Sequence, residues 1–159
     1  MKVDEKMTGS ARVPVITGGC QCGAVRYALY VTPQNAHACH CRMCQRATGG
    51  LFAALAGAPR ADFVWTRGTP AFFSSSSLAR RGYCAQCGTP LSFAYEQPTA
   101  RFYVTIGTLD EPAGVPIVRQ YGIESRLPWV QFCESLPAEA TGTDATAAAY
   151  LATMQNYQR

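Results

Sequence analysis

Alternating hydrophobic and polar positions begin near Val13 and predict β-strands. In the stretch from Ala24 to Val31, every second residue is valine, tyrosine or leucine. A period of two places alternate side chains on one face, so this stretch is predicted to be a half-buried strand. Further short strands are expected at residues 51–56, 62–66, 71–74, 91–95 and 102–107.

Turn-forming residues separate these segments. Glycine, proline or serine occurs between them at residues 58–59, 67–70, 74–77 and 97–98. Many short strands at close spacing, with no long amphipathic helix among them, predict an all-β fold. At 159 residues the chain is long enough for one domain with a sizeable core, which we expect over residues 13–137.

The two ends of the chain lack this pattern. Residues 1–12 show no hydrophobic periodicity and are expected to form a flexible lead-in. Thr143 and Asp144 could cap a helix over residues 145–157. We therefore expect residues 138–159 to be a tail that contains a short helix and takes no part in the chemistry.

The composition is that of an ordinary globular protein, with 48% hydrophobic and 15% charged residues. The longest apolar stretch, residues 51–58, is far shorter than the roughly 20 residues that a membrane helix needs. No apolar run follows the lysines near the N-terminus, so no secretory signal is expected. These features predict a soluble, cytoplasmic protein that has no membrane partner.

The net charge of +4 comes mainly from arginines that are scattered along the chain. No dense basic run and no repeat of aromatic and basic residues is present, which argues against nucleic-acid binding. A mild attraction for small anionic substrates is the simpler inference.

Cysteine spacing gives the clearest indication of chemistry. Seven of the eight cysteines lie in C-x-C or C-x-x-C spacings, and these are Cys20, Cys22, Cys39, Cys41, Cys44, Cys84 and Cys87. Such spacings are typical of metal ligands, and in a cytoplasmic protein they favour zinc over disulfides. Cys133 stands apart and is expected to be a small buried hydrophobic residue.

Two of the motifs together predict a closed structural zinc site. Zinc binds thiolates tetrahedrally at about 2.3 Å, which places the sulfurs roughly 3.8 Å apart. Cys20 and Cys22 point to the same face of an extended segment, and the distant pair Cys84 and Cys87 forms the complementary half. A glycine follows each pair and permits backbone angles that other residues rarely adopt. We expect this site to join two remote parts of the sheet.

The third motif supplies Cys39, Cys41 and Cys44, with no fourth cysteine nearby. Three protein ligands and an open fourth position are how catalytic zinc sites are built. In an extended run the side chain of His40 points away from its neighbouring thiols, and His37 would need a tight turn to join them. A second structural zinc, completed by water or a histidine, is the alternative.

An open zinc site of this kind can act on a thiol. Zinc lowers the pKa of a bound thiol and holds it as a thiolate near neutral pH. Such a thiolate can add to an aldehyde carbon, so that a carbon–sulfur bond forms or, in reverse, breaks. Two classes of protein therefore fit: a zinc lyase that acts on a thiol–aldehyde adduct, and a zinc-stabilised binding module without catalysis.

Three ordered motifs carry a resemblance to a known family. They are GGCQCGAVRY at 18–27, CHCRMCQR at 39–46 and RGYCAQCGTPL at 81–91. In these motifs and their spacings, the chain from about Val13 to Pro137 resembles the glutathione-dependent formaldehyde-activating enzyme family, also called the GFA or centromere protein V domain family.

The resemblance implies an all-β fold of several small coiled antiparallel sheets held by zinc, similar to the exchange chaperones of Rab GTPases. It implies a structural zinc bound by Cys20, Cys22, Cys84 and Cys87. It also implies a second, catalytic zinc bound by Cys39, Cys41 and Cys44. The activity that it implies is a carbon–sulfur lyase reaction, the synthesis of S-(hydroxymethyl)glutathione from glutathione and formaldehyde. The oligomeric state stays open.

One position departs from the family pattern. Similar members often carry a histidine nine residues before the tryptophan that corresponds to Trp129, and here that position is Gln120. Glutamine keeps the ability to form hydrogen bonds but does not titrate near neutral pH as histidine does. A role of the family's histidine in proton transfer would therefore be absent from this chain.

Overall fold

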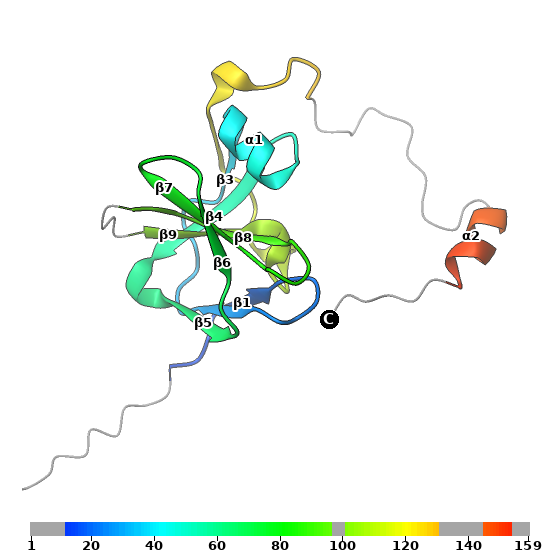
Figure 1. Cartoon of the computed structure of the whole chain (residues 1–159), viewed down its shortest axis with the longest axis horizontal. Helices are drawn as coiled ribbons and strands as arrows, with labels where there is room; N and C mark the ends of the chain where they lie inside the picture. The colour runs from blue at the N-terminus through cyan, green and yellow to red at the C-terminus, as the bar shows by residue number, and fades with distance from the viewer. Residues whose placement is uncertain (1–11, 97–100, 131–144, 154–159) are drawn as a thin grey trace, which may run out of the picture.

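The computed structural model describes residues 12–96, 101–130 and 145–153. Its strands are β1 (Ile16–Gly19), β2 (Arg26–Leu29), β3 (His37–Cys39), β4 (Ala53–Pro59), β5 (Phe63–Arg67), β6 (Ala71–Ser74), β7 (Ala79–Tyr83), β8 (Pro90–Tyr95), β9 (Arg101–Thr105) and β10 (Arg119–Tyr121). The α-helices are α1 (Arg42–Thr48) and α2 (Ala145–Leu151) (Figure 1). Short 3₁₀ turns lie at Arg60–Asp62, Ile106–Thr108, Pro112–Gly114 and Ile123–Ser125.

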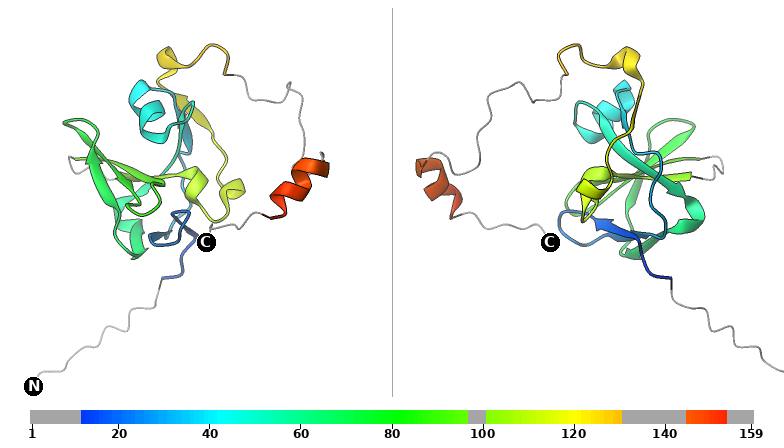
Figure 2. Two further views of the ribbon diagram at one scale, coloured as in Figure 1. Left: turned by 45° about the vertical axis from the view of Figure 1, so that its right-hand side comes forward. Right: turned by 180° about the vertical axis from the view of Figure 1, so that it is seen from behind.

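Within the described residues the strands form two sheets. The smaller has three strands in the order β1-β2-β5, and the larger has seven in the order β10-β3-β4-β9-β8-β7-β6. Neighbouring strands are antiparallel except β10 and β3, which are parallel. In Figures 1 and 2, α1 and the turn at Ile123–Ser125 lie at one end of the domain, and β1 lies toward the other. The predicted all-β fold with a short C-terminal helix is confirmed.

Most of the expected strands are present with small shifts of their ends. The alternating stretch from Ala24 to Val31 contains β2, and its side chains Tyr27 and Leu29 are buried. Residues 71–74 form β6 as expected, and the strands expected at 51–56, 62–66, 91–95 and 102–107 correspond to β4, β5, β8 and β9. The expected lead-in up to Ala11, the cap at Thr143 and Asp144, the helical residues after Thr153, and Cys133 lie outside the described residues.

β1 lies in the stretch after Val13 where the alternation begins. Four other strands or α-helices lie outside the ranges expected from the sequence, namely β3, α1, β7 and β10. β3 and β10 are only three residues long, too short to show a period of two. The pair Arg80 and Arg81 suggests a solvated turn, but both residues lie in β7. Their guanidinium groups cover the rings of Phe72 and Phe93, at 4.8 and 4.9 Å from the ring centroids. Long arginine stems can bury themselves on apolar surface in this way, so charge alone does not exclude a strand.

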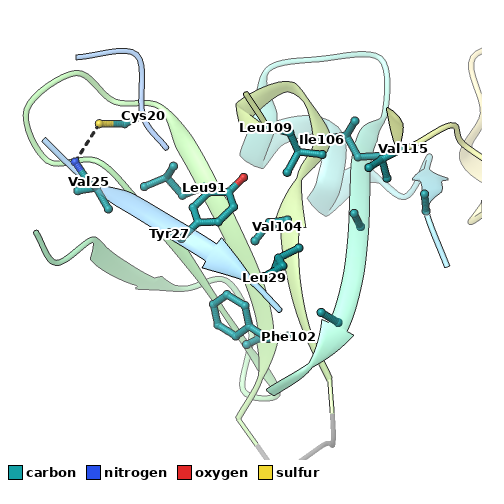
Figure 3. Close-up of a cluster of buried hydrophobic side chains, with 14 of the residues drawn as sticks. Cys20, Val25, Tyr27, Leu29, Leu91, Phe102, Val104, Ile106, Leu109 and Val115 are labelled. Atoms are coloured by element: carbon teal, nitrogen blue, oxygen red, sulfur yellow. Dashed lines mark hydrogen bonds between the residues drawn. The ribbon is translucent and has the colours of Figure 1, made fainter. Parts of the chain in front are cut away.

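The main core lies between the two sheets. Figure 3 shows buried side chains of β2, β8 and β9 in contact with those of the Ile106–Leu109 segment. The phenol of Tyr27 is fully buried, and its hydroxyl is 2.7 Å from that of Thr108. Burial raises the pKa of Tyr27 far above its ordinary value. A hydrogen bond at the only polar atom of this side chain makes its complete burial tolerable.

Aromatic rings connect the sheets at the other end of this core. Phe63 of β5 lies 4.1 Å from Phe102 of β9, measured between ring centroids. Trp65 meets both of these rings edge to face. Such pairs add roughly 0.5–1.5 kcal/mol each beyond the burial of their area. The three-stranded sheet is therefore held against the larger one by aromatic contacts as well as by aliphatic ones.

None of the helices in the described part of the chain has the length and apolar character that are needed to span a bilayer.

We predict that Leu91→Ala destabilises the domain strongly. Leu91 is 0% exposed in the main core, and removal of a buried leucine side chain costs about 2–5 kcal/mol. The free energy of unfolding is measured by urea titration. The control is Val64→Ala, because Val64 is 44% exposed on β5 and should change stability by no more than about 0.5 kcal/mol. Equal losses in the two variants would contradict the assignment of this core.

Candidate metal centres

The first cysteine group joins two segments that are far apart in the sequence. Cys20 and Cys22 follow β1, whereas Cys84 and Cys87 lie in the turn between β7 and β8. Their four sulfur atoms all lie within 4.8 Å of one another. The Sγ atoms of Cys20 and Cys22 are 3.5 Å apart, and those of Cys22 and Cys84 are 3.8 Å apart. These separations match the roughly 3.8 Å between thiolates on a tetrahedral zinc ion.

Local backbone geometry explains how each pair of thiols converges. Gly23 and Gly88, the residues directly after the two pairs, have φ angles of 76° and 77°. The N–H of each glycine donates to the carbonyl of the first cysteine of its pair, at 3.0 Å for Cys20 and 2.8 Å for Cys84. The chain therefore turns tightly after each second thiol, and the expected role of the two glycines is confirmed.

Thr89 connects the two turns, a role that cysteine spacing does not predict. Its hydroxyl oxygen accepts a hydrogen bond from the N–H of Gln21 at 3.2 Å and lies 3.1 Å from the Sγ atom of Cys87. The only signal in the sequence is a hydroxyl residue two positions after Cys87. These two contacts of Thr89 help to hold the Cys20–Cys22 segment in position against the Cys84–Cys87 turn.

Hydrogen bonds favour the thiolate at Cys20 and at Cys87. Burial alone would raise the pKa of Cys20, but the N–H of Val25, 3.2 Å from its sulfur, and the neighbouring thiols lower it overall (Figure 3). At Cys87 burial again acts to raise the pKa, and hydrogen bonds from Thr89 outweigh it and bring the pKa to about 6. At Cys22 the N–H of Ala24 acts to lower the pKa, but burial and the neighbouring thiols outweigh it and raise the pKa to about 12. Thiolates are the forms that bind metal, so an ion would displace the proton of Cys22.

The second group lies where β3 passes into α1. Cys39 ends β3, Cys41 is the N-cap residue of α1, and Cys44 lies in its first turn. The three sulfur atoms lie within 4.8 Å of one another, and the N–H of Cys44 is 3.4 Å from the sulfur of Cys41. An extended run is expected here from the sequence, but the first turn of α1 brings Cys44 back toward the other two thiols.

Neither histidine near this group joins it. Among the described residues, this second group consists of the sulfurs of Cys39, Cys41 and Cys44, and no histidine nitrogen lies within 4.8 Å of all three. His37 is buried, and its Nδ1 lies 3.0 Å from the carbonyl oxygen of Asn35. Nε2 of His40 donates to Oε1 of Gln120 at 3.0 Å. Gln120, the position that departs from the family pattern, therefore holds a buried histidine beside the thiols.

Arg81 supplies a positive charge to this second group. Its Nη2 donates to the sulfur of Cys44 at 3.3 Å, while its guanidinium covers the ring of Phe93. Two consecutive arginines suggest a solvated turn, but Arg81 lies in β7 directly beside Phe93 of β8, and this pairing places its guanidinium over the Phe93 ring. A half-buried arginine in contact with sulfur stabilises the thiolate by charge and by hydrogen bonding.

The thiols of this group share their protons unequally. Hydrogen bonding from Cys39, and then from Arg81, lowers the pKa of Cys44 to about 5. The pKa of Cys39 is raised far above its ordinary value, because its hydrogen bond to Cys44 favours its protonated form and because it is partly buried. At neutral pH the group thus holds a thiolate on Cys44.

A cavity of about 430 Å³ opens directly onto this group. Cys39, Cys41 and Cys44 line one part of it, with Arg81 beside them. Four aromatic residues, Phe93, Tyr95, Tyr103 and Tyr121, line much of the rest, together with aliphatic side chains and the polar residues Asn35, His37, Ser75 and Ser76. This volume falls in the range of small-molecule binding sites. A ligand in the cavity could therefore reach the three sulfurs.

Fold and sites together define a small β protein with one group of four thiols and one of three, each of which could hold a metal ion. The family model for the glutathione-dependent formaldehyde-activating enzyme matches residues 15–122, more than half of the chain. The chain belongs to this family.

Two further proteins are similar to it. A Schizosaccharomyces pombe protein named as an uncharacterized lyase is 27% identical over 92 residues. That match covers 58% of this chain and 66% of the yeast protein, just under two thirds of its length. The crystal structure of a Rhodobacter sphaeroides protein matches with a TM-score of 0.53 at 24% identity, over 65% of this chain and 98% of that chain. The second likeness concerns the fold alone.

We predict that Arg81→Gln raises the pKa of Cys44 above about 5, because the thiolate loses its cationic neighbour. The pKa of Cys44 is expected to rise by roughly one to two, which is the size of effect that one adjacent charge has on a pKa. It is measured on metal-free protein as the pH dependence of Cys44 alkylation, read by mass spectrometry. Arg80→Gln is the matched control, because Arg80 lies over Phe72. An equal shift in the control would rule out a specific effect of Arg81.

We predict that Gly122→Ala weakens metal binding by the three-cysteine group. Gly122 has a φ of 62°, and a Cβ atom there would lie 2.9 Å from the backbone nitrogen of Cys41. Displacement of a ligand's support typically lowers metal affinity about 10–100-fold. Zinc affinity is measured by competition with a chelator. Gly49→Ala is the control, since its φ of 66° brings the same backbone strain but its Cβ would meet nothing within 4 Å. Equal weakening in both would contradict the prediction.

Proposed function

We propose that the protein is a zinc-dependent carbon–sulfur lyase that forms or cleaves a thiol–aldehyde adduct at the three-cysteine group. The observation that carries the proposal is that Cys39, Cys41 and Cys44 all line one cavity and have no fourth ligand side chain among the described residues. The family's name and the lyase name of the yeast relative support the same reaction class.

The four-cysteine group has the structural role in this proposal. Cys20, Cys22, Cys84 and Cys87 would hold one zinc ion, and this ion would join the segment after β1 to the β7–β8 turn. Cys20 and Cys84 are buried within the main core. An ion at this place contributes to folding stability, as closed thiolate sites do.

The three-cysteine group has the catalytic role. A zinc ion held by Cys39, Cys41 and Cys44 would keep a substrate thiol as thiolate near neutral pH. In the reaction the substrate's sulfur bonds to the aldehyde carbon, the π pair of the C=O bond moves to oxygen, and the thiol's proton ends on that oxygen. Cleavage is the reverse, and neither direction needs an oxidant or a reductant.

The protein's own side chains would prepare the site for this step. Arg81 offsets the negative charge of the thiolates through its contact with Cys44. Hydrogen bonds with Asn35, and then with Arg119, lower the pKa of Tyr121, a cavity residue. Tyr103 lines the same cavity, and burial raises its pKa, so Tyr121 is the more acidic of these two phenols beside the thiols.

Glutathione and formaldehyde are the thiol and aldehyde that the family's name suggests, and a cytoplasmic location would supply reduced glutathione. We assign the activity to a domain of residues 13–137. In this proposal the tail of residues 138–159, including α2, takes no part in the chemistry.

We predict two zinc ions per chain and unequal effects of losing each. Cys84→Ser should abolish cooperative unfolding, because its group joins the core. Cys44→Ser should stay folded but lose adduct formation by about 100-fold or more. Folding is measured by circular dichroism, zinc content by mass spectrometry on protein purified without chelators, and adduct formation by NMR.

The outcomes separate a lyase from a binding module. A single tightly held zinc, with Cys39, Cys41 and Cys44 freely alkylated in the purified protein, would identify a zinc-stabilised module without catalysis. Equal loss of folding in the Cys84→Ser and Cys44→Ser variants would indicate two structural sites.

A further inference from the structure

The walls of the cavity beside the three-cysteine group are mostly apolar. Besides its four aromatic residues, Met43, Leu55 and Leu78 line it. Several of these side chains are exposed although they are large and hydrophobic: Leu78 is 59% exposed and Tyr95 is 45% exposed. Exposed apolar side chains that gather around a concave surface indicate a ligand that covers them.

The same cavity offers few charged partners to a carboxylate, although Asn35, His37, Ser75 and Ser76 also line it. Arg81 is the only arginine, lysine or acidic residue among the described residues that line it. Its guanidinium already lies against the sulfur of Cys44 and the ring of Phe93, and its Nε is buried. Thiolates on the cavity wall add negative charge. A ligand with two carboxylates, such as glutathione, would find no uncommitted cation here.

The aromatic rings of the cavity lie close to the three-cysteine group. Tyr103, like Cys39 and Cys41, packs against the small apolar cluster that contains Cys44 and Leu55. Phe93 stacks edge to face with Tyr95 at 5.0 Å and lies 5.8 Å from Tyr103, measured between ring centroids. One substituent on a molecule whose sulfur meets the cysteine group would therefore contact several rings.

We propose that the adduct handled at this site carries an uncharged aromatic or bulky apolar substituent. The inference rests on the proposed lyase function and names its substrate class. The substituent could belong to the thiol or to the aldehyde, since the same walls would bind either.

The direct test is binding to the zinc-loaded protein. Benzyl mercaptan and glutathione are compared by isothermal titration calorimetry. Burial of one phenyl group should make benzyl mercaptan bind at least about tenfold more tightly. Equal or tighter binding of glutathione would overturn the inference for the thiol, and the aldehyde would then have to carry the substituent, which turnover decides. Because the binding measurement needs no turnover, its result holds even if the protein proves not to be a lyase.

Turnover then identifies which partner carries the substituent. Rates of adduct formation are compared for glutathione with formaldehyde, benzyl mercaptan with formaldehyde, and glutathione with benzaldehyde. A preference of about tenfold or more for either aromatic pair supports the inference and names the source. A preference for glutathione with formaldehyde would contradict it. Failure of all three pairs would refute the proposed function, while the binding result still stands.

A variant that adds a charge tests whether the aromatic residues that line the cavity set the preference for benzyl mercaptan over glutathione. Tyr95→Arg should weaken benzyl mercaptan and strengthen glutathione, each by about five- to tenfold, since it replaces a ring at the cavity by a cation. Phe72→Ala is the matched control, because Phe72 is similarly exposed and does not line the cavity. It should leave both affinities unchanged. No change in the Tyr95→Arg variant would show that the wall does not select the ligand.

Discussion

The meeting of two thiol pairs from distant segments is the constraint on which the rest of the structure depends. Cys22 and Cys84 are separated by 62 positions, yet their sulfurs lie 3.8 Å apart. Several thiolates at such distances repel one another strongly unless a cation and hydrogen bonds offset their charge. Once the pairs meet, the start of β8 is fixed against the loop after β1, and β7 is fixed beside it. Arg81 lies only three residues before Cys84, so the first group also determines where the cation of the second group lies.

The second group depends on packing rather than on a second pair of distant thiols. Its sulfurs come from one short stretch, and the surroundings hold that stretch from several sides. Gln45 of α1 donates to the carbonyl oxygens of His40 and Ser125, at 2.8 and 3.1 Å. β10 pairs in parallel with β3, and Gly122 follows it in close contact with Cys41. The region around residues 119–125 is thus a support for the three thiols, although it contains no ligand.

The sequence predicts local features well and long-range ones poorly, for a physical reason. Ligand spacing is a property of a few consecutive residues, so each cysteine motif and the turns at Gly23 and Gly88 could be predicted. The joining of the two distant pairs is expected only because a closed zinc site needs four ligands. Strands with a clear period of two, such as β2, could be predicted for the same reason. Arg81 and the aromatic residues that line the cavity come from β7, β8, β9 and β10, and in the sheet β3 and β4 lie between β9 and β10. Their meeting follows from strand order, which no local pattern encodes.

The surroundings of the two groups favour different roles. Cys20 and Cys84 belong to the same buried cluster as Tyr27, Leu29 and Val104, so their sulfurs are held by the main core, while Cys22 and Cys87 are half-buried at its edge. Cys44 belongs to a separate, small cluster, and its neighbours Cys39 and Cys41 are only half-buried at the wall of the cavity. Interiors are close-packed and resist rearrangement, whereas a preformed cavity admits a ligand at little cost. Similar thiol chemistry can therefore serve stability in one place and exchange of a substrate thiol in the other.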